Sequence, residues 1–135
     1  MNRQMKRQCI SHKHNKRHRC SNDSDDSDDE KDVNIYVDGN AIYFHNEVSI
    51  KSVTKLLQCL HALSKKVLYA SNEFKFTPVI DLYIHSEGGD LFAGLSAYDH
   101  IRRNTVQVNT IVDGMVASAA SIILLAGVER KMLAN

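Results

Sequence analysis

The order of apolar segments predicts an α/β fold in which parallel strands alternate with helices. Val79–His85 is an almost continuous apolar run, which is typical of a strand buried on both faces, and Gly88-Gly89 follows it directly. Val106–Val112 is a second β-rich run, and Gly114 stands between it and the next helical segment. Because strand, helix, strand and helix follow one another, we expect parallel strands joined by right-handed crossovers.

Two shorter runs ahead of this unit predict a hairpin. Val33–Val37 and Ala41–Phe44 are strand-like, and they flank Asp38-Gly39-Asn40. An Asp-Gly pair between such runs is a hairpin signal, because glycine adopts the positive φ of the turn at little cost.

Three helices are expected. The first begins at Ile50 after Ser49, a good N-cap residue, and Ser71–Pro78 is expected to be the loop that follows it. Its buried stripe is predicted to contain Ile50, Val53, Leu56, Leu57, Leu60, Leu63 and Val67. The stripe of the second helix is predicted to contain Leu91, Leu95, Tyr98 and Ile101. The third helix runs from Ser118 to about Ala126 and is stopped by Gly127.

The composition is that of an ordinary globular protein with a charged N-terminal arm. The 135 residues are 43% hydrophobic and 24% charged, and the net charge of +1 gives no overall attraction to nucleic acid or membrane. Residues 1–20 carry basic side chains without acids, and residues 23–32 are strongly acidic. Since residues 1–32 contain few apolar side chains, we expect a disordered basic-then-acidic tail, followed by a folded domain over residues 33–135.

The tail also groups side chains that are able to bind metals, but their spacing matches no standard zinc module, so no metal site is predicted. These side chains are Cys9, His12, His14, His18 and Cys20. The basic block lacks aromatic residues for base stacking, which favours a solvated arm over a nucleic-acid contact. No apolar run reaches membrane-spanning length and no secretion signal is visible, so we expect a cytoplasmic protein.

Two strand-to-helix turns contain the residues that could take part in catalysis. In His85-Ser86-Glu87-Gly88-Gly89-Asp90, the glycine N–H groups can point at an oxyanion or at a substrate strand. In Asp113–Ser121, Ser118 stands at a helix N-terminus among alanines that leave room for a substrate carbonyl. Taken singly, the first is better explained as a tight turn and the second as a helix N-cap.

The pair of turns is more informative than either alone. Turns that follow neighbouring parallel strands lie at the same edge of a sheet. One turn would offer Ser118 as a nucleophile and the other would offer backbone donors, which is the arrangement that acyl transfer needs.

Three segments resemble the Clp protease proteolytic subunit family, in the family's order and with similar spacing, over about residues 33–135. The run from His85 to Asp99 resembles its Ser-Pro-Gly-Gly segment and following helix. Gly114-Met115-Val116-Ala117-Ser118 resembles its Gly-x-Ala-Ala-Ser nucleophile turn. Ile42–Val48 resembles the early strand that leads into the first helix.

The resemblance implies an α/β, crotonase-like ββα spiral, here its N-terminal portion and incomplete at the C-terminus. It also implies a subunit of an ATP-dependent serine endopeptidase that cleaves polypeptides with a Ser-His-Asp triad and forms a homo-oligomeric ring. Ser118 would be the nucleophile, and Gly89 and Ala119 would supply the oxyanion-hole N–H groups. Gly88 and Gly89 would hold the substrate as an added strand. No cofactor is implied for this chain, because a partner AAA+ unfoldase would use the ATP.

The chain departs from the family pattern at three points. Glu87 replaces the family's proline and puts a charge beside the substrate groove. Val116 replaces a small residue before Ala117. The family's catalytic histidine and aspartate lie beyond the third helix, whereas the last of the seven histidines here is His100.

Other residues with catalytic potential have weaker claims. His85 ends a strand next to the glycine turn and is a minor candidate for a substitute base. Ser121 is a rival nucleophile, but its place inside the helix favours a packing role. Neither Asp81 nor Asp99 has a claim on a triad.

Two other functions stay open. The first is a non-catalytic structural or assembly subunit, which the missing triad histidine and aspartate favour. The second is a crotonase-fold enzyme that acts on acyl thioesters, with Glu87 as the only candidate acid or base near the site.

Overall fold

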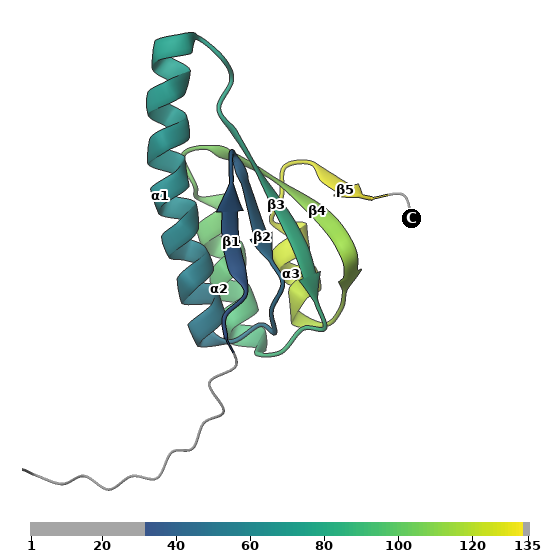
Figure 1. The fold of residues 1–135 in the computed structure, drawn as a ribbon. Helices are drawn as coiled ribbons and strands as arrows, with labels where there is room; N and C mark the ends of the chain where they lie inside the picture. Colours follow the sequence, from purple (N-terminus) through teal and green to yellow (C-terminus); the bar gives the residue numbers. More distant parts are fainter. Residues whose placement is uncertain (1–31, 134–135) are drawn as a thin grey trace, which may run out of the picture. The chain divides into compact units, whose positions relative to one another are not determined.

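The computed structural model describes residues 32–133, which form one five-stranded sheet and three helices (Figure 1). The elements in chain order are β1 (Ile35–Asp38), β2 (Ala41–Phe44), α1 (Ile50–Phe74), β3 (Val79–Ser86), α2 (Leu91–Arg102), β4 (Gln107–Val116), α3 (Ala119–Leu125) and β5 (Arg130–Met132). The predicted disordered tail and its Cys and His side chains lie outside the described residues, apart from the exposed Asp32. No helix in the described part of the chain is long and apolar enough to cross a membrane.

The strands follow the order β1-β2-β3-β4-β5 across the sheet. The expected hairpin is present, because β1 and β2 pair antiparallel around a turn at Gly39, whose φ is 58°. The pairs β2–β3 and β3–β4 are parallel, as the alternation of strands and helices predicted, and β4–β5 is parallel too. The strand β5 was not expected from the sequence, because its three residues are all exposed.

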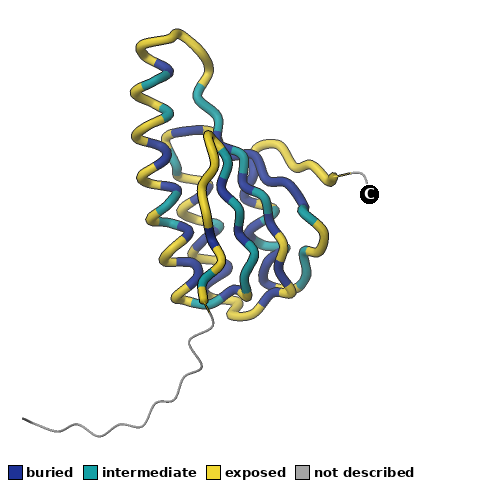
Figure 2. Tube along the Cα trace, viewed as in Figure 1, coloured by how far each residue is buried: buried dark blue, intermediate teal, exposed yellow. Residues whose placement is uncertain are grey.

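The helices pack on one face of the sheet, and the core lies between the two layers (Figures 1 and 2). In β3 the buried side chains alternate: Ile80, Leu82 and Ile84 face the helices. The intervening Asp81 and Tyr83 are only half-buried, so the prediction of a strand buried on both faces is wrong. The reason is that no described helix covers the second face of the sheet.

The first helix begins as the sequence predicted but ends later. Ser49 is the N-cap, and its hydroxyl accepts a hydrogen bond from the N–H of Ser52 at 3.1 Å, within a capping box. The helix continues to Phe74 and ends at Lys75 in the left-handed conformation, so the first half of the loop expected at Ser71–Pro78 is helical. Ser71 stays compatible with the helix because its hydroxyl donates to the carbonyl oxygen of Leu68.

The predicted apolar stripe of α1 is correct in its centre and wrong at its start. Val53, Leu56, Leu60 and Leu63 are buried. Ile50 is 72% exposed, since it lies in the first turn at the edge of the core.

The predicted stripe of the second helix is correct at Ile101, which is buried, but the helix buries small residues instead of the two leucines. Leu91 and Leu95 are 52% and 44% exposed, whereas Ala93, Gly94 and Ala97 are buried. The cause is the close approach of α2 to α3. A Cβ at Gly94 would lie only 3.0 Å from the carbonyl oxygen of Ala119.

Candidate active site

The turn after β3 and the turn after β4 are in contact at one edge of the sheet. The N–H of Ala117 donates to the carbonyl oxygen of Ser86 at 3.0 Å, which continues the β3–β4 pairing into the two turns. A Cβ placed on Gly88 would lie 2.6 Å from the Cβ of Ser118 and 2.8 Å from the carbonyl oxygen of Ala117. Only glycine therefore allows the first turn to approach the second this closely.

Ser118 occupies a backbone conformation that serine rarely adopts. Its φ is 49° and its ψ is −128°, and its side chain is exposed. It stands at the N-cap position of α3, but its hydroxyl makes no capping hydrogen bond. The alternative that explained Ser118 as an ordinary N-cap thus loses its main physical basis, because serine is preferred at the N-cap position for that hydrogen bond. A strained serine in a strand-to-helix turn is also how hydrolases expose a nucleophilic oxygen.

The glycine pair is held by the segment before α1. The N–H of Val48 donates to the carbonyl oxygen of Gly88 and the N–H of Asp90 donates to the carbonyl oxygen of Val48, both at 2.7 Å. In such a parallel bridge the N–H of Gly89 points away from Val48. Gly88 and Gly89 have φ values of 106° and 140°, and a Cβ on Gly89 would collide with the carbonyl oxygen of Val48.

Ala119 lies directly beside this pair. A Cβ on Gly88 would be 3.1 Å from the amide nitrogen of Ala119, and the Ala119 side chain is buried at the start of α3. The structure therefore brings Gly88, Ser118 and Ala119 together. Ser121 is half-buried inside α3, and its amide donates to the carbonyl oxygen of Ser118 at 3.0 Å.

A polar groove of about 530 Å³ runs past the glycine pair. Its lining includes the exposed Glu87 carboxylate, at the place where the sequence departs from the family's proline. The lining residues are Asp32, His45, Asn46, Glu47, His85, Ser86, Glu87, Gly88 and Gly89.

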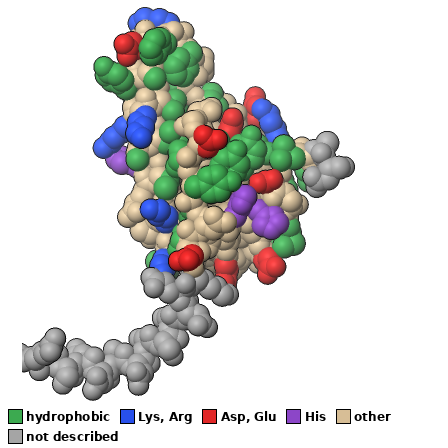
Figure 3. Space-filling view, viewed as in Figure 1, with side chains coloured by type: hydrophobic (Ala, Val, Ile, Leu, Met, Phe, Trp, Pro, Cys, Tyr) green, Lys and Arg blue, Asp and Glu red, His purple; other side chains and the backbone are tan. Residues whose placement is uncertain are grey.

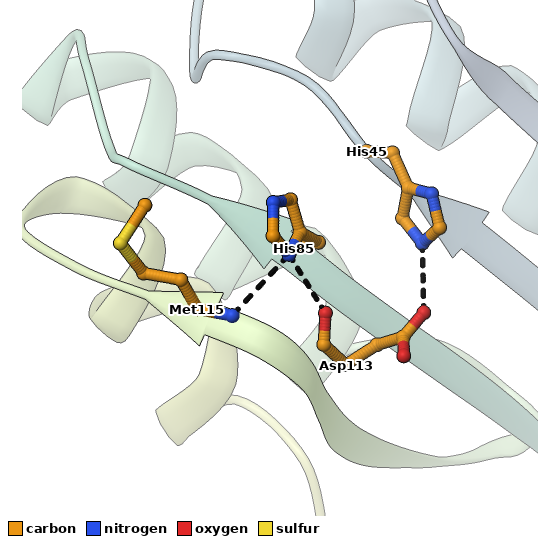
Figure 4. Close-up of polar contacts among 4 residues, drawn as sticks. All are labelled: His45, His85, Asp113 and Met115. Carbon is orange, nitrogen blue, oxygen red and sulfur yellow. Dashed lines mark hydrogen bonds and ion pairs between the residues drawn. The ribbon is translucent and has the colours of Figure 1, made fainter.

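A cluster of His45, His85 and Asp113 lies next to the turns and was only partly anticipated (Figure 4). The Nε2 of His45 is 2.9 Å from the Oδ2 of Asp113. The Nδ1 of His85 is 2.8 Å from the carbonyl oxygen of Asp113 and 3.3 Å from the amide nitrogen of Met115. The sequence singled out His85 alone. The signal for His45 was its place directly after the expected strand Ala41–Phe44. His85 has a similar place, at the end of the expected strand Val79–His85.

The open face of the sheet carries a ladder of aromatic rings (Figure 3). Tyr43 stacks between Tyr36 and Tyr83, with ring centroids 4.6 and 4.7 Å apart. The pKa of Tyr43 is raised above its ordinary value. Desolvation is the largest cause, and the nearby tyrosine hydroxyls and carboxylates add to it by charge repulsion. The rings of His45 and His85 continue this surface, with centroids 5.8 Å apart.

The two aspartates dismissed from the sequence lie away from the turns. Asp81 is on the open face and accepts a hydrogen bond from Asn109 at 3.4 Å, and Asp99 is exposed on α2. Within residues 32–133 no group of three or more His, Cys, Asp or Glu side chains is arranged to hold a metal ion.

Comparison with known proteins gives one consistent family. The Clp protease family model matches residues 39–135. The ATP-dependent Clp protease proteolytic subunit of Cyanophora paradoxa is 39% identical over 89 residues, which cover 66% of this chain and 45% of that subunit. The subunit of Bacteroides thetaiotaomicron is 46% identical over 52 residues, covering 38% of this chain and 24% of that subunit.

Two solved structures share the fold. The catalytic domain of the ClpP protease from Plasmodium falciparum superposes with a TM-score of 0.54 at 33% identity, covering 69% of this chain and 48% of that one. ClpP1 from Listeria monocytogenes gives a TM-score of 0.55 at 24% identity, covering 65% of this chain and 46% of that one.

The expected α/β, crotonase-like fold is thereby confirmed, since Clp catalytic domains have that fold. The chain spans about half the length, or less, of the relatives that it matches. Because the family model covers most of the sequence and the relatives agree with it, the chain belongs to the Clp protease family.

Proposed function

We propose that this chain is the nucleophile-bearing portion of a Clp-type serine endopeptidase subunit, with Ser118 as the nucleophile. The observation that carries the proposal is the conformation of Ser118: positive φ, exposed, uncapped and pressed against Gly88. Family membership supplies the reaction class, which is hydrolysis of peptide bonds in polypeptide substrates.

The proposed chemistry follows from the two turns. The Oγ of Ser118 attacks the carbonyl carbon of the scissile peptide. The N–H groups of Gly89 and Ala119 stabilise the oxyanion that develops, because preorganised donors act most strongly where charge appears. Gly88 and Gly89 hold the substrate backbone as an added strand. A histidine and an aspartate must take and return the serine proton. By resemblance, that pair belongs to the part of the family fold beyond α3.

His85 is a poorer choice for this base. Its Nδ1 is engaged by the backbone of Asp113 and Met115 (Figure 4). A base must instead reach the serine hydroxyl within about 3 Å.

The proposal extends to partners. We propose that the subunit assembles with further copies of itself and receives polypeptides from an AAA+ unfoldase, which would hydrolyse the ATP, in the cytoplasm. Family membership supports this assembly. Sedimentation of the full-length protein, alone and with an unfoldase, tests it.

The decisive experiment is covalent labelling by a serine-directed phosphonate. The full-length protein, including any sequence encoded after Asn135, is treated with the probe and the modified residue is located by mass spectrometry. We expect the label at Ser118, loss of labelling and of peptide cleavage in Ser118→Ala, and retention of both in Ser121→Ala. Residues 1–135 alone should show almost no turnover, because they contain no histidine after Ser118.

Several results would redirect the assignment. Labelling at Ser121, or cleavage that survives Ser118→Ala, would refute Ser118 as the nucleophile. No labelling of the full-length protein would favour a structural subunit. Hydrolysis of an acyl thioester that is lost in Glu87→Gln would favour the crotonase-type alternative.

A further inference from the structure

The strand β4 contains a bulge immediately before the Ser118 turn. Ile84 pairs with Val112, but the next pair is Ser86 with Val116. One residue of β3, His85, therefore stands opposite three residues of β4, namely 113–115. Two extra residues are accommodated on β4, and bulges of this kind re-aim the chain that follows them.

The side chain of His85 takes the place of the missing ladder bonds. In a regular parallel pair, Ser86 would stand opposite Gly114. The carbonyl oxygen of Asp113 would then accept from the backbone N–H of Ser86, and the N–H of Met115 would donate to the carbonyl oxygen of Ser86. In the structure the imidazole Nδ1 lies 2.8 Å from that carbonyl oxygen and 3.3 Å from that amide nitrogen. A protonated Nδ1 donates to Asp113, and an unprotonated Nδ1 accepts from Met115.

Gly114 makes room for the ring. Its φ is 98°, and a Cβ there would lie 2.6 Å from the Nδ1 of His85. The ring and the glycine are therefore fitted to each other, and the bulge cannot hold this shape around a larger residue at position 114.

A second histidine fixes the bulge from the other side of β3. The Nε2 of His45, at the end of β2, bonds the carboxylate of Asp113 at 2.9 Å. Both side chains are about one-quarter to one-third exposed, so this bond is partly shielded from water. The contact ties the first residue of the bulge to β2 across the intervening strand (Figure 4).

The bulge decides where Ser118 lies. Without it, Ser86 would pair with Gly114 instead of Val116. That register differs by two residues, so every side chain would keep its face and the hydrophobic pattern would not oppose the slip. At about 3.3 Å per residue, Ser118 and the following Ala119 would move about 6.6 Å along the strand, away from Gly88.

We propose that His45, His85 and Asp113 are positioning residues that hold the β4 bulge and thereby place the Ser118 hydroxyl against the glycine turn. The inference rests on the proposed function of Ser118. None of the three residues touches the substrate in this role, and each acts through the backbone of residues 113–117.

The test uses the full-length protein and four variants: His85→Ala, His85→Asn, Asp113→Asn and the control Asp81→Asn. The control removes a carboxylate from the same open face, away from the bulge. Two quantities are measured: the saturating rate of phosphonate labelling at Ser118, and hydrogen exchange of residues 113–117. Thermal unfolding reports whether each variant is folded.

In His85→Ala we expect the saturating labelling rate to fall about 100-fold, as a misplacement of about 1 Å can do, while the half-saturating probe concentration is unchanged. Exchange at residues 113–117 should accelerate. Asp113→Asn should show a smaller loss. His85→Asn should recover most of the rate, since an amide offers both a donor and an acceptor near the position of Nδ1. Asp81→Asn should label as the unaltered protein does.

Unchanged labelling in folded His85→Ala would overturn the inference and leave the proposed function intact. So would a loss in Asp81→Asn equal to that in Asp113→Asn. If His85→Ala does not fold, His85→Asn and Asp113→Asn decide by the same criteria. If the unaltered protein takes no label at Ser118, the proposed function fails, and the role in placing a nucleophile fails with it. Hydrogen exchange would then still report whether His85 holds the bulge.

Discussion

The contact between Gly88 and Ser118 gives the sharpest test of the two-turn site. We choose Gly88→Ala, which adds a single methyl group. The added Cβ would lie 2.6 Å from the Cβ of Ser118, 2.8 Å from the carbonyl oxygen of Ala117 and 3.1 Å from the amide nitrogen of Ala119. Carbon atoms in comfortable contact are about 3.5–4.0 Å apart, so the two turns must separate by about 1 Å.

Two effects contribute to the expected magnitude. Alanine at a φ of 106° is strained, which lowers the free energy of unfolding by about 1–3 kcal/mol. The separation of the turns also moves Ser118 relative to the N–H groups of Gly89 and Ala119. A displacement of about 1 Å costs about 100-fold in rate when geometry limits the reaction.

The assay combines urea unfolding with phosphonate labelling of Ser118 in the full-length protein. Gly39→Ala is a matched control, because Gly39 also has a positive φ, of 58°, but a Cβ there meets no atom within 4 Å. We expect both variants to lose stability and only Gly88→Ala to lose labelling beyond its unfolded fraction. Equal labelling rates in the two folded variants would refute the claim that the turns form one site.

Two further predictions concern the scaffold. Ser52→Ala removes a buried hydroxyl that accepts from the N–H of Ser49 and donates to the carbonyl oxygen of Glu47, so the free energy of unfolding should fall by about 1–2 kcal/mol. Urea denaturation measures the change. Thr54 is the control, because its exposed hydroxyl lies on the same helix but caps nothing, and an equal loss in Thr54→Ala would contradict the capping argument. Residues 1–32 should be removed by limited proteolysis and leave a folded remainder that begins near Val33, as sequencing of the products would show. Protection of the whole tail would contradict the predicted disorder.

Part of the fold was predictable because the chain obeys simple patterns there. The hairpin at Gly39, the start of α1 after Ser49 and the parallel β3–β4 pair all follow from local signals. The small buried residues of α2 were not predictable, unlike Ile101 on the same helix, because the close approach of α3 is what requires small side chains there. Spacing of large apolar residues carries no information about such a contact.

The candidate site was predictable in part. The two turns were recognised from glycines and a serine that follow strands, and their contact follows from parallel pairing. The bulge in β4 was invisible, because the expected strand ended at Val112 and the real one continues to Val116. The contacts of His45 and His85 with Asp113 depend on that bulge, so no spacing rule in the sequence could reveal them.

The backbone of Ser118 separates a structural explanation of the turn from a functional one. Among the described residues that are not glycine, only Lys75 and Ser118 have positive φ. Lys75 ends α1, where a left-handed residue is the usual way to close a helix. Ser118 begins a helix, where the usual residue has an extended backbone and caps with its side chain. It does neither, at a strain of about 1–3 kcal/mol, although replacement by glycine would relieve that strain. Helix capping therefore gives no reason for a serine at this position, whereas the proposed role as a nucleophile requires a hydroxyl that is exposed and uncapped.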